Sequence, residues 1–200
     1  MIRRYGNRYL CHPCCGGRKP AQSQYDHNGG AMVIRPETDG DEAAISRLNR
    51  DAFGGDVEAR LVDLLREAGA VIASLVAIDE AGEVIGHILF SPATIMSRSH
   101  EMQVASLAPM AVAPTRQRRG IGSMLVRRGL HQCKLAGYRA AIVVGHPNYY
   151  PRLGFSADFV ANLENPFAKG DAFMGIELAR GSLSDLGEGR IIYPDVFNRL

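Results

Sequence analysis

A basic, glycine-containing turn between an apolar run and an amphipathic helix constrains this chain more than any other feature. The apolar run covers residues 104–112, the turn at residues 117–122 reads QRRGIG, and the helical pattern continues to about Ala136. Two glycines two residues apart let the backbone aim several N–H groups at one point at the start of a helix, where the helix dipole adds positive charge. The order of strand, turn and helix therefore predicts a cradle for an anionic group.

Two widespread phosphate-binding motifs do not fit this turn. The dinucleotide motif GxGxxG needs a third glycine where Leu125 stands, and the nucleoside triphosphate motif needs a Gly-Lys-Ser/Thr run after the glycines. The competing interpretation is a tight turn that uses glycine for backbone reasons alone.

A tyrosine-containing segment follows the helix at residues 145–155, with the sequence GHPNYYPRLGF. Together with the turn, it resembles the paired Gln/Arg-x-x-Gly-x-Gly/Ala and Tyr-x-x-x-Gly-Phe signatures of the GNAT superfamily, the acetyl-CoA-dependent N-acetyltransferases. Residues 106–114 are similar to the acetyl-CoA-binding strand of that superfamily, with Pro109 where a bulge splays the strand. Residues 86–91 and the end segment 193–194 resemble a group of bacterial, mostly predicted, acyltransferases within it. The similarity extends over residues 32–197.

The resemblance implies a mixed α/β fold, the GNAT fold, in which helices flank a mixed central sheet with a splayed fourth strand. The pattern of residues agrees with it. We expect Asp41 to cap a first helix that buries Ala44, Ile45, Leu48 and Phe53 and ends at Gly54-Gly55. The other expected elements are strands at about 32–36, 71–78, 83–95, 102–112, 140–144 and 172–178, and helices at about 57–68, 121–136 and 148–153.

Composition limits the classes of function. The chain has 200 residues, 46% of them hydrophobic, and a formal net charge of +2, which suits one domain and argues against nucleic acid or a membrane surface as partner. No apolar stretch reaches the length of a membrane span, and the N-terminus lacks the apolar region of a secretory signal. We therefore expect a cytoplasmic setting.

Residues 1–31 differ from the rest of the chain in charge and in apolar pattern. They carry five basic residues and one acid without apolar periodicity, so we expect a disordered N-terminal extension before a domain at 32–200. The cluster Cys11-His12-Pro13-Cys14-Cys15 could form half of a zinc site, but no second ligand pair follows at the normal distance, and His27 alone would have to complete it. A disordered tail, or an extension upstream of a natural start at Met32, is favoured over that site, and no metal is expected.

The resemblance places acetyl-CoA, as cosubstrate, on the turn and on the splayed strand. Backbone N–H groups near Met110 and Val112 would polarise the acyl carbonyl, and those of the turn would hold the pyrophosphate, helped by one or two of Arg116, Arg118 and Arg119. A solvated basic face is the competing interpretation of these arginines. The expected coenzyme-binding residues are Met110, Ala111, Val112, Gln117, Arg118, Arg119, Gly120, Ile121, Gly122 and Ser123.

Two residues are the candidates for proton transfer. Tyr150 would protonate the departing thiolate, since a phenol stays protonated at neutral pH, and the Tyr-x-x-x-Gly-Phe spacing selects it over Tyr149. His146 is the first choice for the base that takes the proton of the amine, although a packing role competes. His87, Glu101 and a chain of water molecules are the alternatives, because residues 102–112 contain no acid.

These features favour direct acetyl transfer from acetyl-CoA to an amine acceptor in a ternary complex. The alternative is a GNAT-fold module that binds acyl-CoA as a sensor without turning it over. The acceptor is an unidentified small molecule or protein amine, with a homodimer left open. The acceptor pocket is expected to draw on Asp56, Glu58, Glu101 and Asp158.

Overall fold

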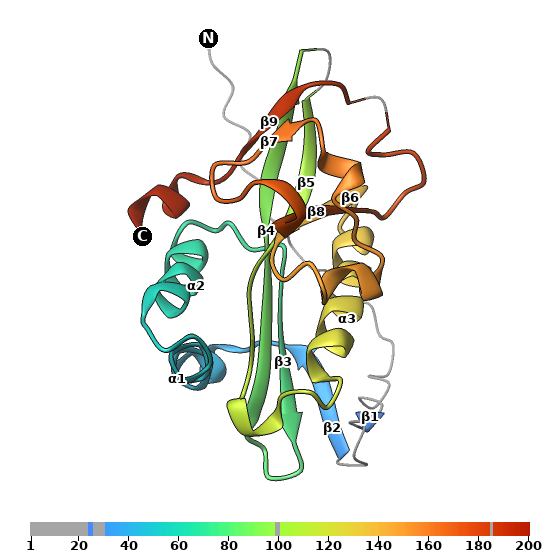
Figure 1. Cartoon of the computed structure of the whole chain (residues 1–200). Coiled ribbons are helices and arrows are strands. Elements are labelled where there is room, and N and C mark those ends of the chain that lie inside the picture. The colour runs from blue at the N-terminus through green and yellow to red at the C-terminus, as the bar shows by residue number, and fades with distance from the viewer. Residues whose placement is uncertain (1–23, 26–30, 99–100, 185) are drawn as a thin grey trace, which may run out of the picture.

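The structure is a computed structural model that describes residues 24–25, 31–98, 101–184 and 186–200. Its strands are β1 (Gln24–Tyr25), β2 (Ala31–Pro36), β3 (Ala73–Asp79), β4 (Val84–Ser97), β5 (Glu101–Val112), β6 (Ala140–Val144), β7 (Leu163–Glu164), β8 (Phe173–Glu177) and β9 (Gly189–Ile192). The α-helices are α1 (Glu42–Phe53), α2 (Val57–Glu67) and α3 (Ile121–Leu135) (Figure 1). Short 3-10 helices are η1 (Asp39–Asp41), η2 (Pro114–Arg116), η3 (Tyr150–Leu153), η4 (Asp158–Val160), η5 (Gly170–Ala172) and η6 (Asp195–Arg199).

The first helix follows its predicted pattern, with two corrections. Ile45 and Leu48 are buried, and Gly54 ends the helix with a φ of 75°, its N–H donating to the Arg50 carbonyl. Phe53 is 46% exposed, because at 100° per residue it lies about 140° around the helix from Leu48. Asp41 precedes α1 without capping it, because its carboxylate is taken by Arg35 and Thr38.

The sheet is mixed, in the strand order β1-β2-β3-β4-β5-β6-β8. Neighbouring strands in this order are antiparallel, except that β5 and β6 are parallel. The long strand β4 changes its neighbour along its length: residues 84–90 pair with β3, and residues 94–97 pair with β9, which also pairs with β7. The predicted mixed α/β fold is confirmed.

Strand β5 carries the expected bulge and then separates from β6. Between the pairs Ile88↔Met110 and Phe90↔Leu107 the register shifts by one residue, so β5 has an extra residue near Pro109. Pairing with β6 ends at Leu107↔Val143. The segment 108–112 thus keeps β4 on one edge and has no strand on the other.

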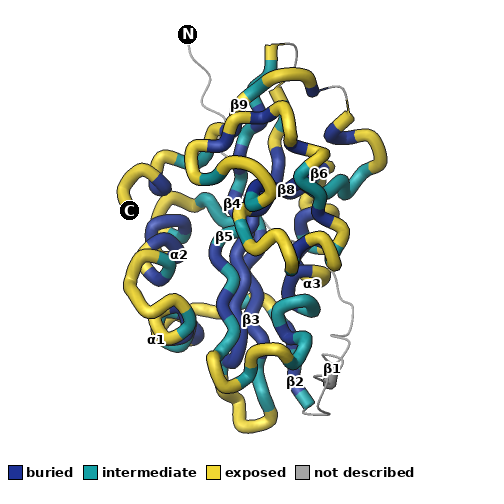
Figure 2. Tube along the Cα trace, viewed as in Figure 1, coloured by how far each residue is buried: buried dark blue, intermediate teal, exposed yellow. Residues whose placement is uncertain are grey.

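Helices cover both faces of the sheet. Figure 1 shows α1 and α2 on one side and α3 on the other, and Figure 2 shows the buried strands between them. On the α3 side, a Cβ at Gly129 would run into the Phe90 ring, so this glycine permits a close contact between the helix and the sheet. Cys133, about one turn after Gly129 on the same face of α3, is fully buried, and burial raises the pKa of its thiol to about 12, as expected of a core residue.

The N-terminal extension lies mostly outside the described residues, as do Cys11, Cys14, Cys15 and His27. Within it, β1 pairs with β2, and β2 begins at Ala31, so part of the sequence before Met32 joins the sheet. Of the described helices, none is both long enough and apolar enough to cross a membrane.

Candidate active site

The turn before α3 presents unpaired backbone donors. Arg118 and Gly120 both adopt left-handed conformations, with φ values of 61° and 82°, and this alternation bends the chain sharply into the helix. Gly120 caps α3 without a side chain, and the first bond inside the helix runs from Met124 N–H to the Gly120 carbonyl. Among the described residues, no backbone carbonyl accepts from the N–H groups of residues 120–123. Such a group of converging donors at a helix N-terminus binds anions.

Side chains fasten the turn to the sheet. Gln117 Nε2 donates to the Val112 carbonyl at 3.2 Å, which ties the turn to the end of β5. Arg116 pairs with Asp79 at 3.0 Å and is therefore held on the β3–β4 hairpin. Of the three arginines considered, Arg118 lies exposed at the turn and Arg119 is partly buried. The start of the turn is thus anchored to β5 and to the β3–β4 hairpin, and Arg118 is the most accessible of these cations.

The carbonyl-binding residues predicted on β5 follow the bulge. Met110, Ala111 and Val112 pair with β4 on one edge, while their other edge lies beyond the end of the β6 pairing. Ala111 is buried, and Met110 and Val112 pack against the core on the α3 side. Backbone groups on the open edge are therefore available to a ligand that enters between β5 and β6.

Tyr150 lies in a tight aromatic pocket. Its ring meets Tyr149 and Phe155 edge-on, with centroid distances of 5.1 and 5.5 Å, and a Cβ at Gly145 would run into it. Its hydroxyl has no hydrogen-bond partner among the described residues, yet it is not one of the fully buried unpaired atoms. Burial raises the Tyr150 pKa well above its usual range, so the hydroxyl stays protonated at neutral pH.

The Tyr149 side chain reaches the turn, a position that the sequence motif does not predict. Its hydroxyl lies 3.2 Å from Ser123 Oγ and 2.8 Å from the position that a Cβ on Gly122 would take. The η3 segment therefore brings one tyrosine of the pair to the N-terminus of α3 and buries the other. The adjacent tyrosines were visible in the sequence, but the spacing motif pointed to Tyr150 alone.

The candidates for the base differ in their exposure and in their distance from the bulge of β5. His146 is exposed, and its carbonyl accepts from the N–H groups of Tyr149 and Tyr150, which holds it close to η3. Glu101 lies at the start of β5, more than about 20 Å along the strand from the bulge at 3.3 Å per residue, which argues against it.

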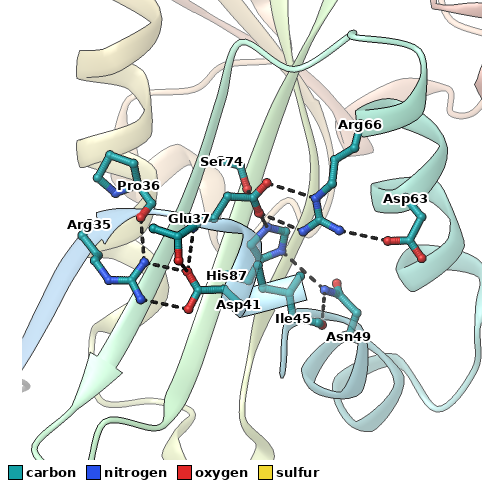
Figure 3. Close-up of polar contacts among 11 residues, drawn as sticks. Arg35, Pro36, Glu37, Asp41, Ile45, Asn49, Asp63, Arg66, Ser74 and His87 are labelled. Atoms are coloured by element: carbon teal, nitrogen blue, oxygen red, sulfur yellow. Dashed lines mark hydrogen bonds and ion pairs between the residues drawn. The ribbon is translucent and has the colours of Figure 1, made fainter. Parts of the chain in front are cut away.

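His87 is enclosed in a polar network beneath α1 and α2 (Figure 3). Asn49 Nδ2 donates to its Nδ1 at 3.4 Å, so Nε2 carries the proton and donates to Ser74 Oγ at 2.9 Å. Ser74 donates in turn to Glu37 at 2.6 Å, and Arg66 donates to both oxygens of the same carboxylate. His87 is fully buried with both ring nitrogens engaged, so an amine cannot contact it.

Burial and hydrogen bonding fix the charges of this network. Burial lowers the pKa of His87 and outweighs the opposing effect of Glu37, so the ring is neutral. Burial also opposes the Glu37 charge, but hydrogen bonds from Arg66 and Ser74, with His87 Nε2 3.7 Å away, hold its pKa well below the usual range. A carboxylate, an arginine and a neutral imidazole thus share one site. Nothing in the spacing of these residues along the chain indicated that they would meet.

A cavity of about 770 Å³ lies beside β7 and β9, lined by residues of the segment 157–173 together with Arg190 and Ile191. Asp158 lines it, whereas Asp56, Glu58 and Glu101, the other acids expected to meet the acceptor, do not. Phe173 closes one side and pairs with Val144 at the end of β6. The cavity thus reaches β8 next to the end of β6, but none of its lining residues belongs to β5 or β6.

The sequence and fold of this chain are similar to those of a known protein family and of individual proteins. A family model described as "Acetyltransferase (GNAT) domain" matches residues 33–157. The uncharacterised N-acetyltransferase YhbS of Escherichia coli is 35% identical over 169 residues, covering 84% of this chain and 99% of that protein. A second uncharacterised N-acetyltransferase of that bacterium, YjhQ, is 38% identical over 58% of this chain and 64% of its own length.

Solved structures of GNAT acetyltransferases are similar to this structure. The crystal structure of E. coli YhbS in complex with CoA superposes with a TM-score of 0.76 at 30% identity, covering 93% of this chain and 97% of that one. A GNAT family acetyltransferase from Brucella melitensis, solved with acetyl-CoA, gives a TM-score of 0.68 at 34% identity over 83% and 97%.

Proposed function

Because the chain belongs to the GNAT acetyltransferase family, as its sequence resemblance predicted, we propose that it moves an acetyl group from acetyl-CoA to an amine by direct transfer in a ternary complex. The observation that carries this proposal is the position of the unpaired donors at the start of α3. These donors come shortly after the open edge of β5 in the chain. The Tyr149 hydroxyl lies next to Ser123, one of the residues that carry them, and Tyr150 is the following residue.

Different groups of the site bind the pyrophosphate, stabilise the oxyanion and protonate the thiolate. The N–H groups of residues 120–123 hold the pyrophosphate, with Arg118 adding charge. Backbone N–H groups on the open edge near Met110 and Val112 stabilise the oxyanion that forms when the amine nitrogen attacks the carbonyl carbon, and each such donor contributes about 3 kcal/mol. As the carbon–sulfur bond breaks, the Tyr150 hydroxyl gives its proton to the thiolate sulfur.

The amine loses its proton to His146 or to water. His146 is exposed beside η3 and can exchange its proton with solvent, which supports it over the enclosed His87. We further propose that the acceptor enters through the cavity lined by Phe173, since Phe173 pairs with Val144, the residue after the last β5–β6 pair. The cytoplasm is the compartment proposed, and the mass of the protein in solution tests for a homodimer.

One observation favours the second candidate, a sensor that binds acyl-CoA without turnover. Residues 102–112 of β5 contain no acid that could serve as a base, and the buried His87 does not replace it. The missing base affects turnover and leaves coenzyme binding intact.

The two candidates are separated by measuring acetyl-CoA binding and the release of free CoA with a panel of amines. We expect tight binding and CoA release with at least one amine. Tight binding without release for every amine would favour the sensor. Absence of binding would remove the coenzyme site from the turn.

A further inference from the structure

Tyr149 lies where two parts of the proposed site meet. Its hydroxyl is beside the first turn of α3, 3.2 Å from Ser123 Oγ, and its ring contacts Tyr150 edge-on. Tyr149 is partly buried, whereas Tyr150 is 7% exposed. A side chain that only filled the core would not place its polar end against a helix N-terminus with unpaired donors.

Gly122 makes this position of the hydroxyl possible. The Tyr149 oxygen is 2.8 Å from the point that a Cβ at residue 122 would occupy, closer than real Cβ contacts allow. The absent side chain therefore leaves room for the hydroxyl beside residues 122 and 123, whose N–H groups are two of the unpaired donors. An anion held by those N–H groups would lie next to a phenol that can donate a hydrogen bond.

We propose that the Tyr149 hydroxyl donates a hydrogen bond to the diphosphate of the acyl-CoA bound at the turn, exchanging its Ser123 partner for the ligand. Tyr149 is thus a positioning residue, distinct from the proton donor Tyr150. Through the edge-on ring contact, the bound coenzyme also fixes the neighbouring Tyr150 ring. This inference rests on the proposed function, because it takes the turn as the site of the coenzyme.

The test compares Tyr149→Phe with the unmodified protein by calorimetry with acetyl-CoA and by steady-state kinetics. We expect the dissociation constant and the KM for acetyl-CoA to rise about tenfold to a hundredfold, as the loss of one hydrogen bond to a charged group implies. The turnover rate at saturating acetyl-CoA should fall by less than about threefold. S-acetylpantetheine, which lacks the diphosphate, should react equally well with both proteins.

Tyr193→Phe is the matched control. The Tyr193 hydroxyl accepts from Asn165 Nδ2 at 2.8 Å and belongs to an aromatic cluster with Phe167 and Phe197. Its loss should lower the melting temperature and leave the affinity for acetyl-CoA unchanged.

The outcomes separate this inference from the proposed function. If the unmodified protein binds acetyl-CoA and Tyr149→Phe binds it equally well, the inference is wrong and the proposed function stands. An equal loss with acetyl-CoA and S-acetylpantetheine would also overturn it, since the hydroxyl would then act away from the diphosphate. No binding by the unmodified protein would overturn both.

Discussion

The polar groups on the two sides of the sheet differ in how far they are hydrogen-bonded to one another. Beneath α1 and α2, Glu37, Ser74, Arg66 and His87 are bonded to one another with little exposure to solvent. In the part of the chain that the structure describes, the N–H groups of residues 120–123 at the start of α3 have no backbone acceptor, and the Tyr150 hydroxyl on η3 has no hydrogen-bond partner. The first region is complete without a ligand, and the second is not.

This difference indicates what each region contributes. Buried polar groups that bond to one another hold the α1–α2 pair on the sheet, and removing one leaves the others unpaired at a cost in stability. Donors that point into open space contribute little to folding and are ready for an anion. Among the described residues, two buried side-chain oxygens lack a partner: Asn49 Oδ1, next to this network, and Ser91 Oγ on β4.

The largest effect is expected from removing the Tyr150 hydroxyl. Tyr150→Phe keeps the ring and its contacts with Tyr149 and Phe155, but it removes the proton for the departing thiolate. The turnover rate should fall by about 10²–10⁴, with the affinity for acetyl-CoA changed far less. A variant that lost about 1 kcal/mol of stability and kept its turnover would place Tyr150 with the structural groups instead.

Removing the central carboxylate of the buried network should produce the reverse pattern. Glu37→Ala leaves the Arg66 guanidinium, which is 15% exposed, without its main partner. We expect the free energy of unfolding to fall by about 1–3 kcal/mol, with the affinity for acetyl-CoA unchanged in the folded protein. Chemical denaturation and calorimetry measure the two quantities.

Asp63→Ala is the control on the same arginine. Asp63 bonds to Arg66 from a position that is 54% exposed, so its loss should cost less than about 1 kcal/mol. Equal losses from the two variants would mean that burial does not set the value of the Glu37 contact.

A charge placed in the turn tests the second region directly. Gly122→Asp puts a carboxylate where Tyr149 and the proposed pyrophosphate meet, so the dissociation constant for acetyl-CoA should rise at least about tenfold, or roughly 1.4 kcal/mol. Gly55→Asp is the control, because a Cβ there meets nothing within 4 Å and the backbone is not left-handed. Unchanged affinity in folded Gly122→Asp would move the coenzyme elsewhere.

The smallest expected effect is a pH dependence confined to the first region. His87 faces Glu37 and Arg66, and its pKa in the folded protein lies below the usual value of 6.5. The unfolded chain therefore binds a proton below about pH 6.5 that the folded protein does not take up, so stability falls as the pH is lowered through that range. A melting temperature independent of pH between 7.5 and 5.5 would contradict this. His87→Gln should reduce the dependence.

Much of the fold could be predicted because it depends on local pattern. Strand β6 has the predicted bounds, α3 ends one residue earlier than expected, and the bulge lies at Pro109. Strand β9 was not predicted, because a strand of four residues carries little periodicity and forms by pairing with β4, far away in the chain.

The candidate site divides in the same way. The turn at residues 117–122 could be identified because glycine spacing and basic residues act on the local backbone. The position of the Tyr149 hydroxyl could not, since it depends on how η3 packs against α3. The His87 network also escaped prediction, because its members come from the segment after β2 and from α1, α2, β3 and β4, and they meet only in the folded protein (Figure 3).

The change of neighbour along β4 has a consequence for synthesis of the chain. Residues 84–90 of β4 can pair with β3 as soon as the hairpin emerges, since their partners precede them closely. Thr94 to Ser97 pair with Gly189 to Ile192, roughly 100 residues further on. On that edge, the distal half of β4 exposes backbone groups until nearly the whole chain is made, and such an edge can recruit other strands. A ribosome-bound nascent chain that stops short of β9 should therefore aggregate more readily than the finished protein.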